Sequence, residues 1–175
     1  MKDIHGKAIL DYLNGNEKAE LILHNNYGEP EAMPVSVFFR SELDLTVLEH
    51  LALIECHGKV LDVGAGAGAL SLILQERGYD VSGLENSKGC LQAMRELGLQ
   101  NIIEEDFLSH SKQYDTLLIQ MNGMGLAGSL RQVPAFIEKC VSMLNPGGQI
   151  LMDSSDISYL YEDGTVKPKG YYGEV

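Results

Sequence analysis

Three glycines at alternate positions, Gly64, Gly66 and Gly68, follow a short apolar run that ends at Val63. The apolar run predicts a strand buried on both faces, and a helical pattern begins at Ala69. A strand, a glycine turn and a helix bring backbone N–H groups close to a bound nucleotide, because residues without a Cβ let a ligand approach the chain. The same residues also fit the dinucleotide-binding pattern with alanine in third place. The loop alone therefore does not distinguish a dinucleotide site from another nucleotide site, or either of these from an ordinary α/β turn.

Acidic residues stand where the next two strands are expected to end. The strand predicted at 79–84 is followed by Glu85, about 20 residues after the first glycine. A carboxylate there can accept hydrogen bonds from ribose hydroxyls, although a solvated glutamate would give the same pattern. After the strand predicted at 101–103, Asp106 and Phe107 could bind an adenine amino group and pack on its ring. The alternative for this pair is a capping turn with a phenylalanine in the core.

Further candidates for contact with a substrate lie outside the glycine loop. Asn122 follows the strand predicted at 114–121, where it could orient a substrate nucleophile or simply hold a glycine-rich turn. Arg40 could pair with Glu42 or Asp44, or bind an acidic substrate group through its planar guanidinium. Tyr27 is the second candidate substrate contact. No Ser-His-Asp or Cys-His arrangement stands out, and the conceivable general bases are Asp156, Asn122, Tyr27 and His24.

Composition excludes several classes of function. The chain has 175 residues and a formal net charge of −12 without a long basic run, which disfavours nucleic acid and acidic membrane surfaces as partners. The three cysteines are far apart and the five histidines are scattered, so we expect neither a disulfide framework nor a metal site. A polar N-terminus and the absence of an apolar run of roughly 18 residues lead us to expect a cytoplasmic protein.

The order of the elements that position these residues predicts an α/β fold. Strands alternate with helices, which indicates a Rossmann-like, doubly wound, mainly parallel sheet with helices on both faces and two further strands on each side of the glycine-loop strand. We expect a single domain with an N-terminal segment at 1–43, a cofactor-binding core at 44–156 and an irregular tail at 157–175. The N-terminal helix either packs on the core or forms a lid. Beyond the glycine-loop helix, the expected elements are helices at 4–14, 44–56, 88–97 (N-capped by Ser87) and 130–144, irregular chain at 24–43, and a last strand at 149–152.

Taken together, the landmarks resemble the class I S-adenosylmethionine-dependent methyltransferases, over about residues 43 to 156. The aspartate two residues before the first glycine and the Asn-Pro-Gly-Gly turn favour this family over a nicotinamide-dependent enzyme. The landmarks are, in order, residues 60–68, Glu85, Asp106-Phe107 and residues 144–148 ahead of a strand.

The resemblance implies S-adenosylmethionine as cofactor and a role for each matching residue. The three glycines would pass under the methionine part, with Asp62 near its ammonium group. Glu85 would hold the ribose, residues 106–107 the adenine, and Met121 and Asn122 would lie close to the sulfonium and the nucleophile. The cofactor-binding residues expected on this basis are Asp62, Gly64, Ala65, Gly66, Gly68, Glu85, Asn86, Asp106, Phe107, Met121 and Asn122.

The implied activity is methyl transfer to a small molecule, by in-line displacement at the sulfonium methyl, with Asn122 as the candidate catalytic residue. A non-catalytic cofactor-binding module and an NAD-dependent oxidoreductase are the alternatives. Family members usually end in a β-hairpin that completes the sheet, whereas this chain ends at Val175, soon after the fifth strand. We therefore expect a shortened chain, a smaller sheet, or an edge strand covered by another chain, for which a homo-oligomer is one candidate.

Overall fold

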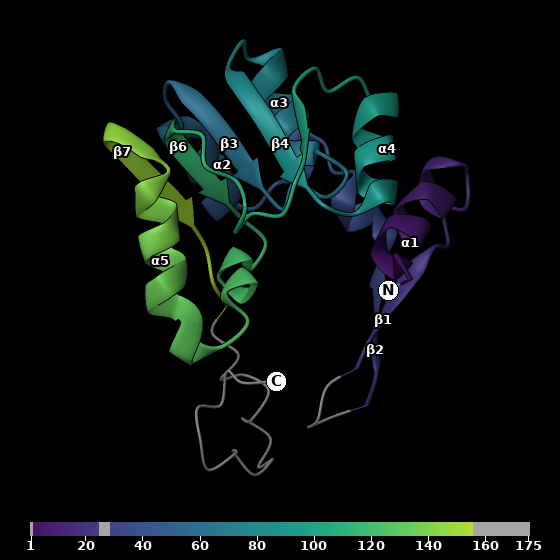
Figure 1. The fold of residues 1–175 in the computed structure, drawn as a ribbon. Helices are drawn as coiled ribbons and strands as arrows, with labels where there is room; N and C mark the ends of the chain where they lie inside the picture. The colour runs from purple at the N-terminus through teal and green to yellow at the C-terminus, as the bar shows by residue number, and fades with distance from the viewer. Residues whose placement is uncertain (1, 25–28, 156–175) are drawn as a thin grey trace.

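A five-stranded parallel sheet forms the centre of the protein, in a computed structural model that describes residues 2–24 and 29–155 (Figure 1). The strand order is β5-β4-β3-β6-β7, so the glycine-loop strand β3 is central and has two strands on each side. All four neighbouring pairs are parallel. The predicted order is confirmed. The strands are β3 (Lys59–Val63), β4 (Asp80–Glu85), β5 (Ile102–Glu104), β6 (Tyr114–Ile119) and β7 (Leu144–Met152).

Helices cover both faces of this sheet, because successive side chains of a buried strand point to opposite sides. On one face, Phe136 of helix α5 packs in the same core cluster as Leu61 of β3. On the other face, Leu53 of α2 and Leu74 of α3 pack with Val60 of β3. The three-layer arrangement expected from the sequence is confirmed (Figure 1). The helices are α2 (Val47–Glu55), α3 (Ala69–Glu76), α4 (Lys88–Glu96) and α5 (Val133–Ser142).

Two boundaries near the end of the sheet differ from the sequence prediction. A short 3₁₀ turn, η4 (Leu130–Gln132), precedes α5, and a proline stands in the first turn of the helix, where its missing N–H is tolerated. The last strand begins at Leu144 rather than at 149. Leu144 pairs with Tyr114, and pairing resumes at Gln149 after a register shift. The Asn-Pro-Gly-Gly sequence is thus an irregularity within β7, not a separate turn before it.

The N-terminal segment is more regular than its prolines and glycines suggested. Strands β1 (Glu20–Leu23) and β2 (Glu31–Pro34) form an antiparallel hairpin, followed by the 3₁₀ turns η1 (Val35–Phe38) and η2 (Glu42–Asp44). The prediction of irregular chain at 24–43 is therefore wrong in part. Short strands of four residues carry too little alternation to be recognised in the sequence.

Helix α1 (Ile4–Leu13) lies against α4, as Figure 1 shows. A Cβ built on Gly89 of α4 would lie 2.3 Å from the backbone of Gly6, so the two helices touch through their glycines. The Asp3 side chain accepts hydrogen bonds from Gly6 N at 2.9 Å and from Gly89 N at 3.0 Å. These contacts favour the packed alternative for the N-terminal helix over a separate lid.

Candidate functional site

A cavity of about 150 Å³ lies where β3, β4 and β5 end, at the carboxyl edge of the sheet. This edge is the usual ligand site of open α/β sheets. It holds Gly64, Glu85, Asn86, Asp106 and Phe107 from the set expected to bind a cofactor. Because ligand pockets usually measure about 300–1,000 Å³, the cavity can enclose only part of a nucleoside cofactor. The other lining residues are Val63, Leu84, Glu105, Leu108 and Leu126.

The glycine loop adopts a backbone conformation that L side chains rarely take. Gly64, Gly66 and Gly68 have φ values of 72°, 58° and 86°. A Cβ on Gly64 would lie 3.8 Å from the side chain of Leu126, so a side chain there would occupy the cavity. Gly64 therefore keeps open the space that a ligand needs next to β3. A Cβ on Gly68 would instead lie 2.9 Å from Met94, so that glycine permits close packing against α4.

The Glu85 carboxylate is fixed by the backbone around it. Its Oε2 accepts a hydrogen bond from Gly66 N at 3.1 Å, and its Oε1 accepts from Asn86 N at 2.8 Å and Ser87 N at 2.9 Å. Ser87 also caps α4, as predicted, by accepting a hydrogen bond from Cys90 N at 3.2 Å. The carboxylate thus stands between the glycine loop and the start of α4, and it lines the cavity.

Asp62 lies beneath the loop and is almost fully buried, with 4% of its surface exposed. Its Oδ2 accepts a hydrogen bond from Ser71 Oγ at 2.7 Å. Burial raises the pKa of the Asp62 carboxyl to about 6, the hydrogen bond from Ser71 opposes the rise, and the negative charge of Glu85 adds to it. A positive charge placed near both carboxylates would be stabilised.

Asp106 and Phe107 combine the features of both alternatives weighed from the sequence. Asp106 Oδ1 accepts a hydrogen bond from Leu108 N at 2.9 Å, which holds the turn after β5. The Phe107 ring packs against Phe136, with a centroid distance of 5.3 Å, and contributes to the core. Both residues nevertheless line the cavity. The turn therefore presents an acid and an aromatic ring at the same place.

Met121 and Asn122 do not line the cavity. They form the turn that leads from β6 into the 3₁₀ segment η3 (Gly123–Ala127), and Leu126 of this segment is the residue that reaches the cavity. Both have positive φ, 59° and 61°. Asp153, to which the sequence assigned no role, accepts hydrogen bonds from both backbone N–H groups.

Arg40, one of the two candidate substrate residues, has a different partner from those predicted. Arg40 pairs with Glu49 rather than with Glu42 or Asp44: its Nη1 lies 3.0 Å from Glu49 Oε2, and Nη2 bonds the other carboxylate oxygen. Glu42 instead pairs with Arg77 at 2.6 Å. The Arg40 guanidinium therefore pairs with a carboxylate of α2. Tyr27 and Asp156 lie outside the described residues.

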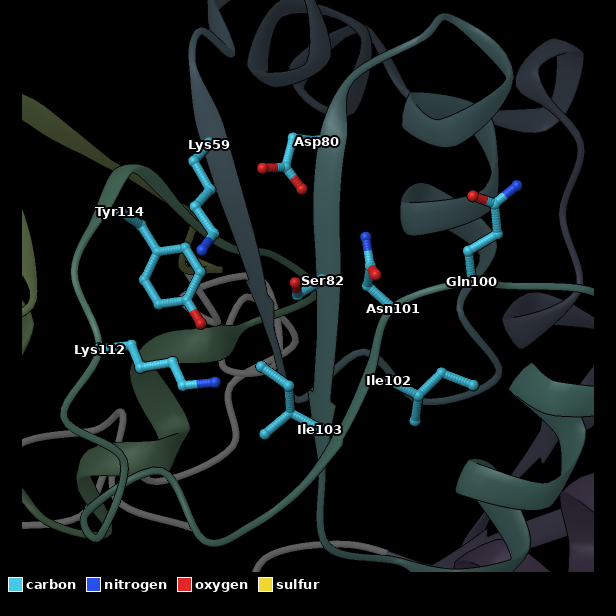
Figure 2. Close-up of a pocket in the computed structure, with 9 residues that line it drawn as sticks. All are labelled: Lys59, Asp80, Ser82, Gln100, Asn101, Ile102, Ile103, Lys112 and Tyr114. Carbon is cyan, nitrogen blue, oxygen red and sulfur yellow. The ribbon is translucent and has the colours of Figure 1, made fainter.

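A second cavity, of about 320 Å³, lies at the opposite edge of the sheet, where the strands begin (Figure 2). Lys59, Asp80 and Ser82 line it from β3 and β4, and Tyr114 lines it from β6. The Lys59 ammonium lies 5.2 Å from the centroid of the Tyr114 ring. None of the residues predicted to bind a cofactor belongs to this cavity, so the smaller cavity is the candidate functional site.

The described part of the chain shows neither a cluster of metal ligands nor a membrane-spanning helix. Within residues 2–24 and 29–155, no three His, Cys, Asp or Glu side chains come together in a group that could hold a metal ion. Among the helices that the structure describes, none combines the length and the apolar character needed to cross a membrane.

Comparisons with known proteins agree with this geometry. The family model described as "Methyltransferase domain" matches residues 60–148. The crystal structure of an S-adenosylmethionine-dependent methyltransferase from Bacteroides fragilis, in complex with S-adenosyl-L-homocysteine, is 36% identical with a TM-score of 0.86. The match covers 93% of this chain and 69% of the Bacteroides fragilis chain. The chain therefore belongs to the class I S-adenosylmethionine-dependent methyltransferase family, as its motifs predicted.

More distant relatives share the fold or part of the sequence. The sugar N-methyltransferase KedS8 from Streptoalloteichus is 17% identical with a TM-score of 0.55, over 76% of this chain and 58% of that one, which supports the fold alone. A ubiquinone biosynthesis O-methyltransferase from Klebsiella pneumoniae is 30% identical in an alignment that covers 55% of this chain. The match covers 42% of that relative, so the chain spans less than half the length of the curated relatives it matches.

Proposed function

We propose that the protein binds S-adenosylmethionine in the cavity at the ends of β3, β4 and β5 and transfers its methyl group to a small molecule. The observation that carries this proposal is the charge of the site. Glu85, Glu105 and Asp106 line the cavity, Asp62 lies beneath its glycine loop, and no Lys or Arg is among the lining residues. A cofactor with a sulfonium and an ammonium group suits this charge, whereas the pyrophosphate of NAD would be repelled.

Each part of the cofactor has a chemical counterpart in the chain. Glu85 already accepts three hydrogen bonds from backbone N–H groups, so about one lone-pair site of its carboxylate remains to accept a hydrogen bond from a ribose hydroxyl. Asp106 and Phe107 offer an acceptor and a ring to the adenine. The open glycine loop and the buried Asp62 provide for the methionine part, with its ammonium group. When bound, S-adenosylmethionine would supply an electrophilic methyl group: the acceptor nucleophile would bond to the methyl carbon in line with the breaking C–S bond, and S-adenosylhomocysteine would leave with the electron pair.

The chain itself then has to align the acceptor and exclude water, since the sulfonium is already a strong electrophile. Asn122 is our candidate for orienting the acceptor. Its Oδ1 accepts a hydrogen bond from Ser155 Oγ at 2.7 Å, which leaves the amide N–H₂ as the group that could donate to an acceptor molecule. A small molecule as acceptor is supported by the net charge of −12, which disfavours nucleic acid. The curated relatives, named as O-methyltransferases of ubiquinone biosynthesis, are consistent with such an acceptor.

Calorimetric titration with S-adenosyl-L-homocysteine tests the proposal. Glu85→Gln keeps the shape of the side chain but removes its charge. We expect its dissociation constant to exceed that of the wild type by about tenfold or more, the usual worth of hydrogen bonds to a charged group. The matched control is Glu104→Gln on neighbouring β5, whose carboxylate is exposed, pairs with Arg95 and lies outside the cavity lining. Failure of the folded wild type to bind, or equal affinity of Glu85→Gln, would contradict the proposal.

A further inference from the structure

We propose that Asp153 is a positioning residue for the cofactor site. Its carboxylate holds Met121 and Asn122 in a left-handed turn and thereby places Leu126 as one wall of the cavity. The inference rests on the proposed function, because the site it concerns is the one assigned to S-adenosylmethionine. Asp153 directly follows β7 and does not line the cavity itself, so it would act through the turn.

The hydrogen bonds of Asp153 are directed at two successive backbone groups. Oδ2 accepts from Met121 N at 3.1 Å, and Oδ1 accepts from Asn122 N at 2.8 Å. The backbone N–H of Asp153 in turn donates to Ile119 O at 3.4 Å, at the end of β6. The residue that directly follows β7 therefore bonds both to the last residue of β6 and to the turn after β6.

The turn needs such support, because its conformation is unfavourable for the residues that adopt it. Met121 and Asn122 have φ values of 59° and 61°, in the region that glycine favours. Asparagine tolerates this region better than most residues, but methionine does not. The next residue is equally constrained: a Cβ on Gly123 would lie 2.4 Å from Ile119 Cγ2. A strained backbone of this kind persists only where surrounding contacts hold it.

The turn is connected to the cavity through η3. This segment begins directly after Asn122 and ends at Ala127, and its Leu126 lines the cavity beside Gly64. The Leu126 side chain is the neighbour nearest to where a Gly64 Cβ would stand. A change in the direction of the turn would therefore move a wall of the site, although neither Met121 nor Asn122 lines the cavity itself.

A double-mutant cycle with S-adenosyl-L-homocysteine as probe separates this role from a merely structural one. We expect Asp153→Ala to raise the dissociation constant about tenfold, because a smaller fraction of the protein keeps the competent turn. In a Met121→Gly background, where the turn is less strained, the same substitution should raise it less than about threefold. Asp153→Asn keeps one acceptor oxygen, so it should raise the dissociation constant by less than Asp153→Ala does. It replaces the alanine variant in the cycle if the alanine variant does not fold.

The matched control is Asp115→Ala, since Asp115 also accepts a backbone hydrogen bond, from Lys59 N at 2.7 Å, but near the opposite edge of the sheet. It should lower the melting temperature and leave the dissociation constant within about twofold. If wild type and Asp153→Ala bind equally, or if Met121→Gly rescues nothing, the inference is wrong.

Hydrogen exchange of the Met121 and Asn122 amides gives a readout that needs no ligand. Both amides should be protected in the wild type and exchange faster in Asp153→Ala. Absence of protection in the wild type overturns the inference whatever the binding result. If the wild type fails to bind S-adenosyl-L-homocysteine while both amides are protected and exchange faster in Asp153→Ala, the proposed function is overturned and the hold of Asp153 on the turn is established.

Discussion

Replacing Asp62 by asparagine should stabilise the protein at neutral pH while it weakens the cofactor site. Burial raises the pKa of this carboxyl from its ordinary value of 3.8 to about 6. At pH 7 the group is ionised in both the folded and the unfolded chain, so its burial costs about 3 kcal/mol of stability. At pH 4 the folded state keeps the proton, and the cost falls below about 1 kcal/mol.

The sign follows from proton linkage. Because the folded state holds the Asp62 proton more tightly than the unfolded chain, the contribution of this group to stability decreases as the pH rises between 3.8 and about 6. Asparagine carries no charge and can still accept the hydrogen bond from Ser71 Oγ, but it puts an amide N–H₂ in place of an acceptor oxygen, which costs about 1–2 kcal/mol. The net effect of Asp62→Asn should therefore be a gain of about 1–2 kcal/mol at pH 7 and a loss of about 1 kcal/mol at pH 4.

Urea denaturation of both proteins at pH 4 and pH 7 measures this difference. Asp115→Asn is the control with the opposite sign, because hydrogen bonds from Lys59 N and Asn145 hold the pKa of the Asp115 carboxyl below its usual value. That variant should lose more stability at pH 7 than at pH 4. If the free-energy difference between Asp62→Asn and the wild type is the same at both pH values, the account of Asp62 is refuted.

Two further substitutions test the packing around the site. Gly89→Ala should lower stability by about 2 kcal/mol or more, because its Cβ would collide with the backbone of Gly6. Limited proteolysis should then release α1 faster, whereas Gly125→Ala, which meets no atom within 4 Å, should behave like the wild type. Arg40→Ala should cost about 2 kcal/mol or more, since it leaves the buried Glu49 carboxylate without its partner. A loss below about 0.5 kcal/mol in thermal denaturation would show that this ion pair is dispensable.

The part of the site formed by strand ends could be predicted from the sequence. Gly64 directly follows β3, Glu85 is the last residue of β4, and Asp106 comes shortly after β5. The carboxyl ends of parallel strands meet at one edge of the sheet. Their meeting therefore required only the strand order, which the α/β alternation predicts. The roles assigned to them with the cofactor stay predictions until binding is measured.

The rest depends on contacts that only the folded chain defines. Asp153 meets Met121 because β6 and β7 pair, and no local pattern relates two residues so far apart in sequence. Arg40 pairs with Glu49 rather than with its nearer acidic neighbours because the capping box of α2, with Glu49 as its third residue, turns that carboxylate inward. The β1–β2 hairpin was missed because its strands are short and mostly exposed.

The most direct test of the central claim is a crystal structure of this chain with S-adenosyl-L-homocysteine. We expect the ribose hydroxyls on the Glu85 carboxylate, the adenine beside Asp106 and Phe107, and the methionine part over the glycine loop. Ligand bound elsewhere, for example in the larger cavity beside Lys59, would contradict the assignment of the site.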